Sequence, residues 1–261
     1  MEQSIPKDSV IVSLTSFPAA ISYAVRAIHS ILDGSVLPDK IVLYLAMSQF
    51  ESEGIPQELL DLAKQNPIFE IRDNGRDIRS YMKLVPALKD FPESVIVTID
   101  DDIVYHRHML RDLLQWHRRI PDAILAHRAK YVRPGEPYRK WPKYRWYHFL
   151  FKKIHSGYRN LQTGVGGVLY PPHSLKDEML DPDLFTRIAP TTDDIWFWAA
   201  SVANGTPVVP IPFGHNKPKE MKKPRELSLK TVNVKSGKDR NADALAAILK
   251  EIPVIGKQIG Y

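Results

Sequence analysis

VIVTIDDD, residues 95–102, is the stretch that decides the fold class of this sequence. Its first five residues are all β-branched and apolar or nearly so, which is typical of a strand buried on both faces of a parallel sheet. Three carboxylates follow directly. Adjacent carboxylates repel one another, and the packing of a strand gives no reason to gather them at its end. The stretch therefore predicts a central strand that leads into a functional site.

The residues on either side of this strand alternate between two patterns. Short apolar runs predict strands over residues 10–14, 40–46, 69–72 and 95–99, and amphipathic runs predict helices over residues 21–32, 56–65, 80–88 and 106–119. Strands that alternate with helices indicate an α/β fold, in which a mostly parallel central sheet is flanked by helices. We expect this arrangement over the first half of the chain.

The pattern changes after Arg133. A strand is expected within residues 123–132, whereas residues 133–163 are rich in Pro, aromatic and basic residues and have no clear period. The later predictions are a glycine-rich strand, a helix, a short strand and a terminal helix, over residues 164–170, 191–203, 208–213 and 242–250.

The composition narrows the chemistry. The 261 residues include no cysteine, which excludes disulfides, thiolate catalysis and cysteine-based metal sites. The formal net charge is +6, and the cations gather in residues 138–159, together with aromatics, and in residues 217–225. Such a balance favours anionic partners. For residues 138–159, four roles stay open: membrane or acceptor contact, binding of single-stranded nucleic acid, a mobile lid, or a solvated loop.

No targeting or membrane-spanning segment is recognised in the sequence. Residues 1–8 carry acidic side chains and no apolar core, and no stretch approaches the roughly 18 apolar residues that a span needs. We expect a cytoplasmic protein, with association to the inner face of the cell membrane as an open role for the basic segments.

The three aspartates predict a cation site. In a parallel sheet the carboxyl ends of the strands are where ligands bind. Mg²⁺ and Mn²⁺ prefer oxygen ligands and commonly bridge to the phosphates of a substrate. Because alternate strand residues face the same side, Asp100 and Asp102 are expected to point together while Asp101 points elsewhere. The alternative is a solvated acidic turn that caps the next helix.

The sequence also resembles a known protein family. Residues 95–102 resemble the metal-binding DXD strand of nucleotide-sugar glycosyltransferases with the GT-A fold, and further motifs over residues 8–215 follow in the family's order. The resemblance implies a GT-A-like, Rossmann-like fold and a set of donor-binding residues along the first half of the chain: Ser13, Thr15, Phe17, Asp73, Arg79, Lys83, Asp100 and Asp101. It also implies that His215, after the last short strand, completes the metal shell with Asp102 and Asp100.

The second half of the chain carries the implied acceptor side. Gly166 and Gly167 lie in a stretch similar to the glycine-rich acceptor strand, and Trp196 follows an acidic pair similar to the family's "ED" motif. In inverting members that motif supplies the general base. We expect Asp194 as the base and Asp193 as the second choice, although the family's glutamate is an aspartate here. The alternative is that a helix start simply favours acidic residues, at about 0.3–1 kcal/mol each.

These observations predict an enzyme, a metal-dependent glycosyltransferase that takes a sugar from a nucleotide sugar. We expect a UDP-sugar donor, Mn²⁺ or Mg²⁺ as cofactor, an inverting mechanism and a glycan or lipid-linked glycan acceptor. The resemblance is to bacterial enzymes of capsule and lipopolysaccharide synthesis. The expected organisation is a catalytic domain over residues 1–215, with a donor half over 8–132 and an acceptor half over 133–215, and a basic extension over 216–261.

Three alternatives stay open beside this prediction. The first is a retaining transferase, since stereochemistry depends on geometry. The second is a nucleotidyltransferase, which also pairs carboxylates with Mg²⁺ but for which no glycine-rich P-loop is present in the sequence. The third is a nucleic-acid-binding module, which charge alone supports.

Overall fold

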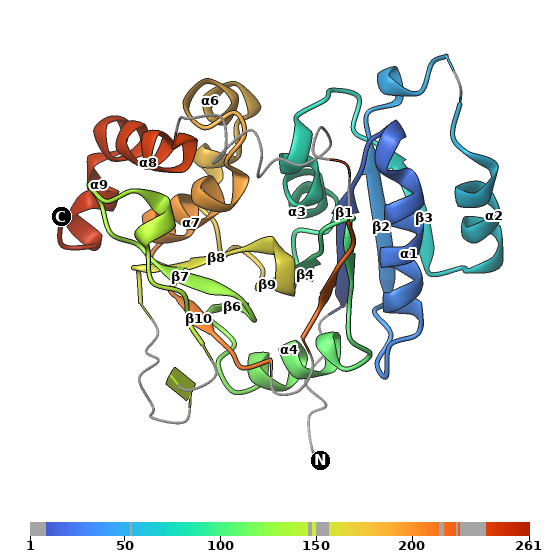
Figure 1. Ribbon diagram of the computed structural model, residues 1–261, viewed down its shortest axis with the longest axis horizontal. Coiled ribbons are helices and arrows are strands. Elements are labelled where there is room, and N and C mark those ends of the chain that lie inside the picture. Colours follow the sequence, from blue (N-terminus) through green and yellow to red (C-terminus); the bar gives the residue numbers. More distant parts are fainter. Residues whose placement is uncertain are drawn as a thin grey trace.

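The computed structural model describes residues 9–52, 54–145, 148–149, 157–213, 217–222, 224 and 239–261. Within them the central sheet has seven strands: β1 Val10–Thr15, β2 Lys40–Leu45, β3 Phe69–Asp73, β4 Val95–Thr98, β6 Ile124–Ala126, β9 Val168–Tyr170 and β10 Val208–Pro210. Their order is β10-β6-β9-β4-β1-β2-β3 (Figure 1). Two small sheets pair β5 Ile103–Val104 with β11 Lys219–Glu220, and β7 Ala129–Tyr131 with β8 Asn160–Gln162.

Helices cover both faces of the central sheet. They are α1 Ile21–Leu32, α2 Gln57–Gln65, α3 Val85–Asp90, α4 Met109–His117, α6 Pro182–Ile188, α7 Asp193–Asn204, α8 Arg240–Glu251 and α9 Pro253–Gln258. The short 3-10 turns η3 Arg79–Lys83 and η5 Gly164–Gly166 carry site residues. The α/β architecture expected from the sequence is confirmed.

The sheet is mostly parallel. Strand β1 pairs in parallel with β2 and β4, and β2 pairs in parallel with β3. Strand β9 is the exception, because it runs antiparallel between β4 and β6. The carboxyl ends of β1 and β4 therefore lie together at one edge of the sheet, where the aspartates follow.

Alternating strand residues build two cores. Val10, Val12 and Leu14 of β1 belong to the cluster that packs under α1, α2 and α4, whereas Ile11 belongs to the cluster beneath α3, α6 and α7. This division is what side-chain alternation demands of a strand buried on both faces.

The C-terminal helices share the second core. Leu245 and Ile248 of α8, and Ile255 of α9, are buried in the same cluster as Trp196 of α7. The extension expected from residue 216 thus ends in two helices that pack against the main body, and the terminal helix predicted over 242–250 is present as α8. No helix in the described part of the chain is long and apolar enough to cross a membrane.

Two sequence predictions of secondary structure were wrong in detail. The helix predicted over 80–88 is divided into η3 and α3, because Pro86 lies in the first turn of α3 and cannot donate a backbone hydrogen bond to a preceding turn. The single strand predicted within 123–132 is two strands, β6 and β7, which belong to different sheets. The first difference matters for function, since η3 carries Lys83.

Candidate active site

Lys83 is the centre of the acidic site. Its ammonium group lies 3.0 Å from Oδ1 of Asp100, 2.9 Å from Oδ2 of Asp193 and 3.9 Å from Oδ1 of Asp194. The side chain comes from η3, and the carboxylates come from the end of β4 and the first turn of α7. The fold therefore brings both predicted acidic motifs together around one buried cation.

The charges of this cluster keep Lys83 protonated. Lys83 is 6% exposed, and burial alone would lower its pKa. The nearby charges of Asp100, Asp193 and Asp194 outweigh that effect, so the pKa of Lys83 lies well above its ordinary value. One ammonium faces three carboxyl groups, which leaves an excess of negative charge when all of them are ionised.

Asp194 is the carboxyl group of this cluster whose pKa is raised. Burial raises its pKa to about 7, with Lys83 opposing the rise and Asp193 and Asp100 adding to it. Its side chain retains 31% exposure, so the carboxyl group is accessible from the site. The backbone N–H of Gly164 donates to its Oδ2 at 3.4 Å. An accessible carboxyl group with a pKa near neutrality is suited to taking up a proton.

Asp193 is held differently. Ser80 donates its hydroxyl to Oδ1 at 2.8 Å, while Lys83 approaches Oδ2, and the residue is 7% exposed. Both oxygens are engaged by fixed partners. Asp193 therefore anchors the cluster, and of the two predicted bases Asp194 is the better placed.

The three strand-end aspartates have separate surroundings. Asp101 accepts a 2.7 Å hydrogen bond from Ser16, in the loop after β1, and the backbone N–H of Asp100 donates to the hydroxyl of Tyr105 at 2.8 Å. Strand β4 ends at Thr98, so Asp101 and Asp102 lie in a turn. Strand alternation, on which the expected common direction of Asp100 and Asp102 was based, therefore does not extend to these residues.

A returning basic segment covers the turn that contains Asp102. Strand β11 pairs antiparallel with β5, and the backbone N–H of Met221 donates to the carbonyl of Asp102 at 2.8 Å. Tyr23 of α1 donates its hydroxyl to the carbonyl of Lys222 at 3.3 Å. Part of the basic stretch predicted over 217–225 thus lies beside the aspartates, where its cations can meet an anionic ligand.

The predicted glycines permit close packing within the site. A Cβ atom on Gly164 would lie 2.5 Å from Oδ1 of Asp100, and one on Gly166 would lie 2.9 Å from the Cβ of His127. Gly167 has a φ of +80°, which favours glycine, and a side chain there would meet Met109. The glycine-rich stretch lets the chain pass directly against the aspartate that Lys83 holds.

Several predicted donor residues lie near this edge with structural partners. Thr15 donates its hydroxyl to the carbonyl of Tyr44, and Asp73 accepts from the backbone N–H groups of Met47 and Gly75. Ser13 is fully buried in β1. These contacts shape the loops around the strand ends.

Phe17 and Arg79 complete the described donor set. Phe17, the residue before the 3-10 turn that starts at Pro18, is half-buried. Arg79 opens η3 with a φ of 57°, unusual for a residue other than glycine. The remaining prediction, His215, lies outside the described residues.

Trp196 requires a correction. Its side chain is 0% exposed, its indole N–H donates to the carbonyl of Met179 at 2.7 Å, and Phe185 packs against it. The ring is therefore part of the core and presents no face to an acceptor, contrary to the expectation from sequence.

Sequence reasoning missed residues that complete the site. Ser16, Ser80 and Tyr105 bind the aspartates but were not among the predicted site residues. Arg128, which lies beside Thr163 and pairs with Glu220 at 3.3 Å, was also missed. The only available signal was position, since Ser16 and Ser80 follow or precede elements that end at the same edge of the sheet.

The carboxylate oxygens at the end of β4 suit a metal ion that a bound substrate also coordinates. Among the described residues, no group of three or more His, Asp or Glu side chains is arranged as a ready metal cage. Asp100 is engaged by Lys83, and Asp101 and Asp102 lie in the turn that follows. Mg²⁺ and its relatives are usually held by one or two carboxylates together with substrate phosphates, and the site suits that mode.

The chain matches no protein-family model and no curated protein sequence. Its fold is α/β, with a mostly parallel seven-stranded sheet flanked by helices. In structure it is similar to a mannosyltransferase from Pyrobaculum calidifontis, PcManGT, solved in complex with GDP-Man and Mn²⁺, with a TM-score of 0.55 and 14% sequence identity over 97% of this chain and 74% of that one. At this identity the similarity supports the fold alone.

Proposed function

We propose that this protein is a metal-dependent glycosyltransferase that moves a sugar from a nucleotide sugar to a hydroxyl group of an acceptor. One observation carries the proposal: Lys83 joins the strand-end Asp100 to the helix-start Asp193, beside an accessible Asp194 whose pKa is about 7. The proposal is supported by the similarity of the fold to that of a mannosyltransferase.

Asp194 acts as the general base in this proposal. The acceptor oxygen attacks the anomeric carbon of the donor sugar, the bond from that carbon to the diphosphate oxygen breaks, and the hydroxyl proton passes to the Asp194 carboxylate. A base with a pKa near the working pH is most effective, and such catalysis contributes about 10²–10⁴-fold. Direct attack of this kind inverts the configuration at the anomeric carbon.

Asp102 is the proposed protein ligand for Mn²⁺ or Mg²⁺, with His215 kept as a second candidate. Asp100, predicted as a metal ligand, is reassigned because the ammonium of Lys83 already lies 3.0 Å from it. When bound, the cation offsets the charge of the leaving diphosphate. Lys219 and Lys222, on the segment that covers the turn, add positive charge on the same side.

The donor side is proposed at the ends of β1 and β3. Asp101, which accepts a hydrogen bond from Ser16, and Asp73 are the proposed contacts to the nucleoside, together with Arg79 and Phe17. We propose a UDP-sugar as donor. GDP-sugars belong in any test, because the similar mannosyltransferase was solved with GDP-Man.

The acceptor is proposed to approach along Gly166 and Gly167, and Trp196 is left out because it is buried. A glycan or lipid-linked glycan of bacterial surface polysaccharide synthesis, such as capsule or lipopolysaccharide, is the proposed acceptor class. The cytoplasmic location, at the inner face of the membrane, belongs to the same proposal.

A thermal-shift screen tests the proposal. Nucleoside diphosphates and their sugars are added with Mn²⁺, with Mg²⁺ or with EDTA. We expect at least one nucleotide to raise the melting temperature with metal present, and the rise to disappear in Asp102→Ala. No shift with any uridine or guanosine diphosphate compound, with or without metal, would count against the function.

A further inference from the structure

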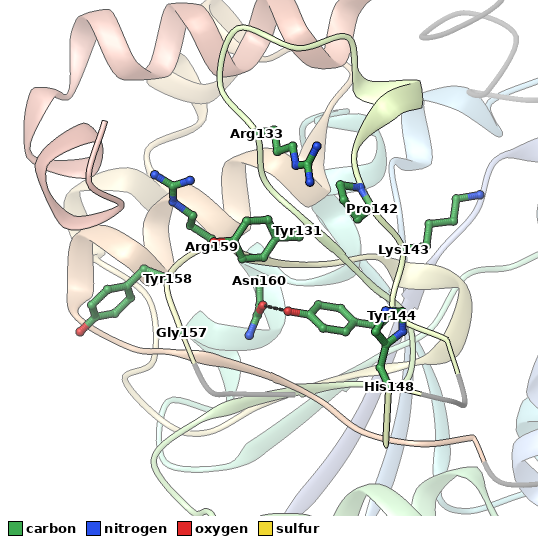
Figure 2. A pocket seen from close by; sticks show the side chains of 10 residues that line it. All are labelled: Tyr131, Arg133, Pro142, Lys143, Tyr144, His148, Gly157, Tyr158, Arg159 and Asn160. Carbon is green, nitrogen blue, oxygen red and sulfur yellow. Dashed lines mark hydrogen bonds between the residues drawn. The ribbon is translucent and has the colours of Figure 1, made fainter. Parts of the chain in front are cut away.

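A second cavity lies away from the acidic site. Its volume is about 490 Å³, within the range of small-molecule sites, and ten residues line it (Figure 2). They are Tyr131, Arg133, Pro142, Lys143, Tyr144, His148, Gly157, Tyr158, Arg159 and Asn160. The proposed transfer chemistry uses none of them.

The lining combines cations with aromatic rings. Arg133, Lys143 and Arg159 bring positive charge, and no acidic side chain is found among the described residues of the lining. Tyr131 is 36% exposed, and its ring lies beside Arg159, whose Cζ is 5.9 Å from the ring centroid (Figure 2). Cations favour an anionic group, and exposed aromatic faces favour the apolar faces of sugar rings or stacked planar groups.

Much of the wall is preorganised. Tyr144 donates its hydroxyl to Oδ1 of Asn160 at 2.6 Å, and Asn160 in turn donates to the carbonyl of Val208 at 2.8 Å. Arg159 donates to the carbonyls of Ile259 and Gly260, which fixes its guanidinium group over the ring of Tyr131. A rigid wall lowers the entropic cost of ligand binding.

Arg133 is held less tightly. Its contact with Glu136 is 3.5 Å long, and both side chains are more than two-fifths exposed. Such an ion pair contributes little to stability, so the guanidinium can turn to a ligand at small cost. Arg133 is therefore the cation best able to bind an anion in this cavity.

A β-ribbon joins the cavity to the acidic site. Tyr131 pairs with Asn160 at one end of β7 and β8, and at the other end the backbone N–H of Thr163 donates to the carbonyl of Arg128. Gly164, the next residue, donates to Asp194. From Asn160 to Gly164 an extended chain covers about 13 Å at ~3.3 Å per residue, a distance that one extended ligand can span.

We propose that this cavity binds a phosphate-bearing sugar of the acceptor, at a distance from the hydroxyl that reacts. The proposal rests on the proposed function for the identity of the ligand as an acceptor. Arg133 and Lys143 meet the phosphate, and Tyr131 packs against the sugar ring. Binding energy from such a remote group serves to position the reacting hydroxyl at Asp194.

Calorimetric titration tests the site without any donor. Glucose 1-phosphate, inorganic phosphate and glucose are titrated into the full chain in EDTA. We expect glucose 1-phosphate to bind the parent protein more tightly than inorganic phosphate or glucose does. Its affinity is expected to fall about tenfold in Arg133→Gln. It is also expected to fall in Tyr131→Ser but to stay unchanged in Tyr131→Phe. Arg26→Gln and Lys64→Gln, which remove exposed cations on α1 and α2, are the controls and are expected to bind like the parent.

Two outcomes overturn the site. One is the absence of glucose 1-phosphate binding to the folded parent protein. The other is equal affinity in Arg133→Gln, Tyr131→Ser and the parent, which would place the binding elsewhere. Circular dichroism of each variant shows whether it remains folded, and Arg133→Gln keeps the test decisive if Tyr131→Ser unfolds.

Two further arms identify the source of the phosphate and separate this proposal from the function. N-acetylglucosamine diphosphate is compared with the same group on a short prenyl chain: tighter binding of the prenyl compound identifies a lipid-linked acceptor, and equal binding a soluble one. Vesicle binding that survives Arg133→Gln and excess glucose 1-phosphate would instead indicate a membrane surface and overturn the proposal. Thermal shifts caused by nucleotide sugars are measured in parallel. Their absence would contradict the proposed function, whereas binding of glucose 1-phosphate in the cavity would still be observed.

Discussion

The ammonium of Lys83 lies 2.9 Å from a carboxylate oxygen of Asp193, although the two residues come from a 3-10 turn and a helix far apart in the chain. The same ammonium reaches Asp100 at the end of β4. Lys83 thereby fixes the distance between the metal-side turn and the helix that carries the proposed base. The predictions below follow from this arrangement.

Asp194→Asn is expected to keep donor binding and to lose transfer, by about 10²–10⁴-fold, because an amide cannot take up the proton. In the parent, the base must be deprotonated, so kcat/KM, which reports the free enzyme, is expected to rise with pH through an apparent pKa of about 7 and then to level off. That value belongs to the coupled carboxyl cluster. Steady-state kinetics from pH 5 to 9 measure it, and equal transfer by the variant and the parent would remove Asp194 as the base.

The raised pKa of Asp194 also predicts an effect on stability. A carboxyl group whose pKa is higher in the folded state binds more protons there, so its ionisation destabilises the fold as the pH rises from about 4 to about 7. Asp194→Asn has no carboxyl group to ionise at this position, so it does not lose stability in this way as the pH rises. Its melting temperature is expected to exceed that of the parent at pH 8 and to approach it at pH 4. A variant that is less stable at pH 8 would contradict the assignment.

Lys83→Met is expected to destabilise the protein by about 3–5 kcal/mol, because the buried carboxylates lose their cation. The raised pKa of Lys83 means that its contribution is present below about pH 10 and is lost only in strongly alkaline solution. The damage is expected to be smaller at pH 5, where Asp194, whose pKa is about 7, is protonated. Urea unfolding at both pH values measures this, with Lys64→Met on the exposed face of α2 as control.

Gly164→Ala is expected to lower kcat clearly while changing the free energy of unfolding only slightly. The new Cβ atom would lie 2.5 Å and 2.8 Å from the two carboxylate oxygens of Asp100, which Lys83 prevents from turning away easily. Gly256→Ala in α9, where the nearest atom is 3.5 Å away, is the matched control and is expected to be nearly neutral. Similar kinetics in Gly164→Ala and the parent would show that the position of Asp100 is not important for turnover.

The parallel half of the fold could be predicted from sequence, because buried strands and amphipathic helices have distinct periods. The helix predicted over 21–32 is α1 with the same bounds, and the strand over 95–99 is β4 with one residue fewer. The short elements could not be predicted: β8 and β11 are three and two residues long, too short for a period to be recognised. Their formation depends on partners far along the chain.

The acidic residues of the site could be predicted from the sequence, but the contacts that join them could not. Adjacent aspartates at a strand end and at a helix start are visible in the sequence, but their joining by Lys83 depends on how η3 breaks before Pro86. Lys83 was expected to contact the donor, and the structure directs it to the carboxylates. Trp196 shows the opposite limit: most residues of α7 are buried, so the sequence does not reveal which of them line the site and which pack in the core.

Crystals soaked with Mn²⁺ and a nucleoside diphosphate, measured at a wavelength where manganese scatters anomalously, test the central claim most directly. The account predicts an anomalous peak within coordination distance of the Asp102 carboxylate, with the diphosphate on its far side and the Lys83–Asp100 contact intact. A well-diffracting soaked crystal with no peak beside Asp102, or with manganese bound in place of Lys83, would contradict it.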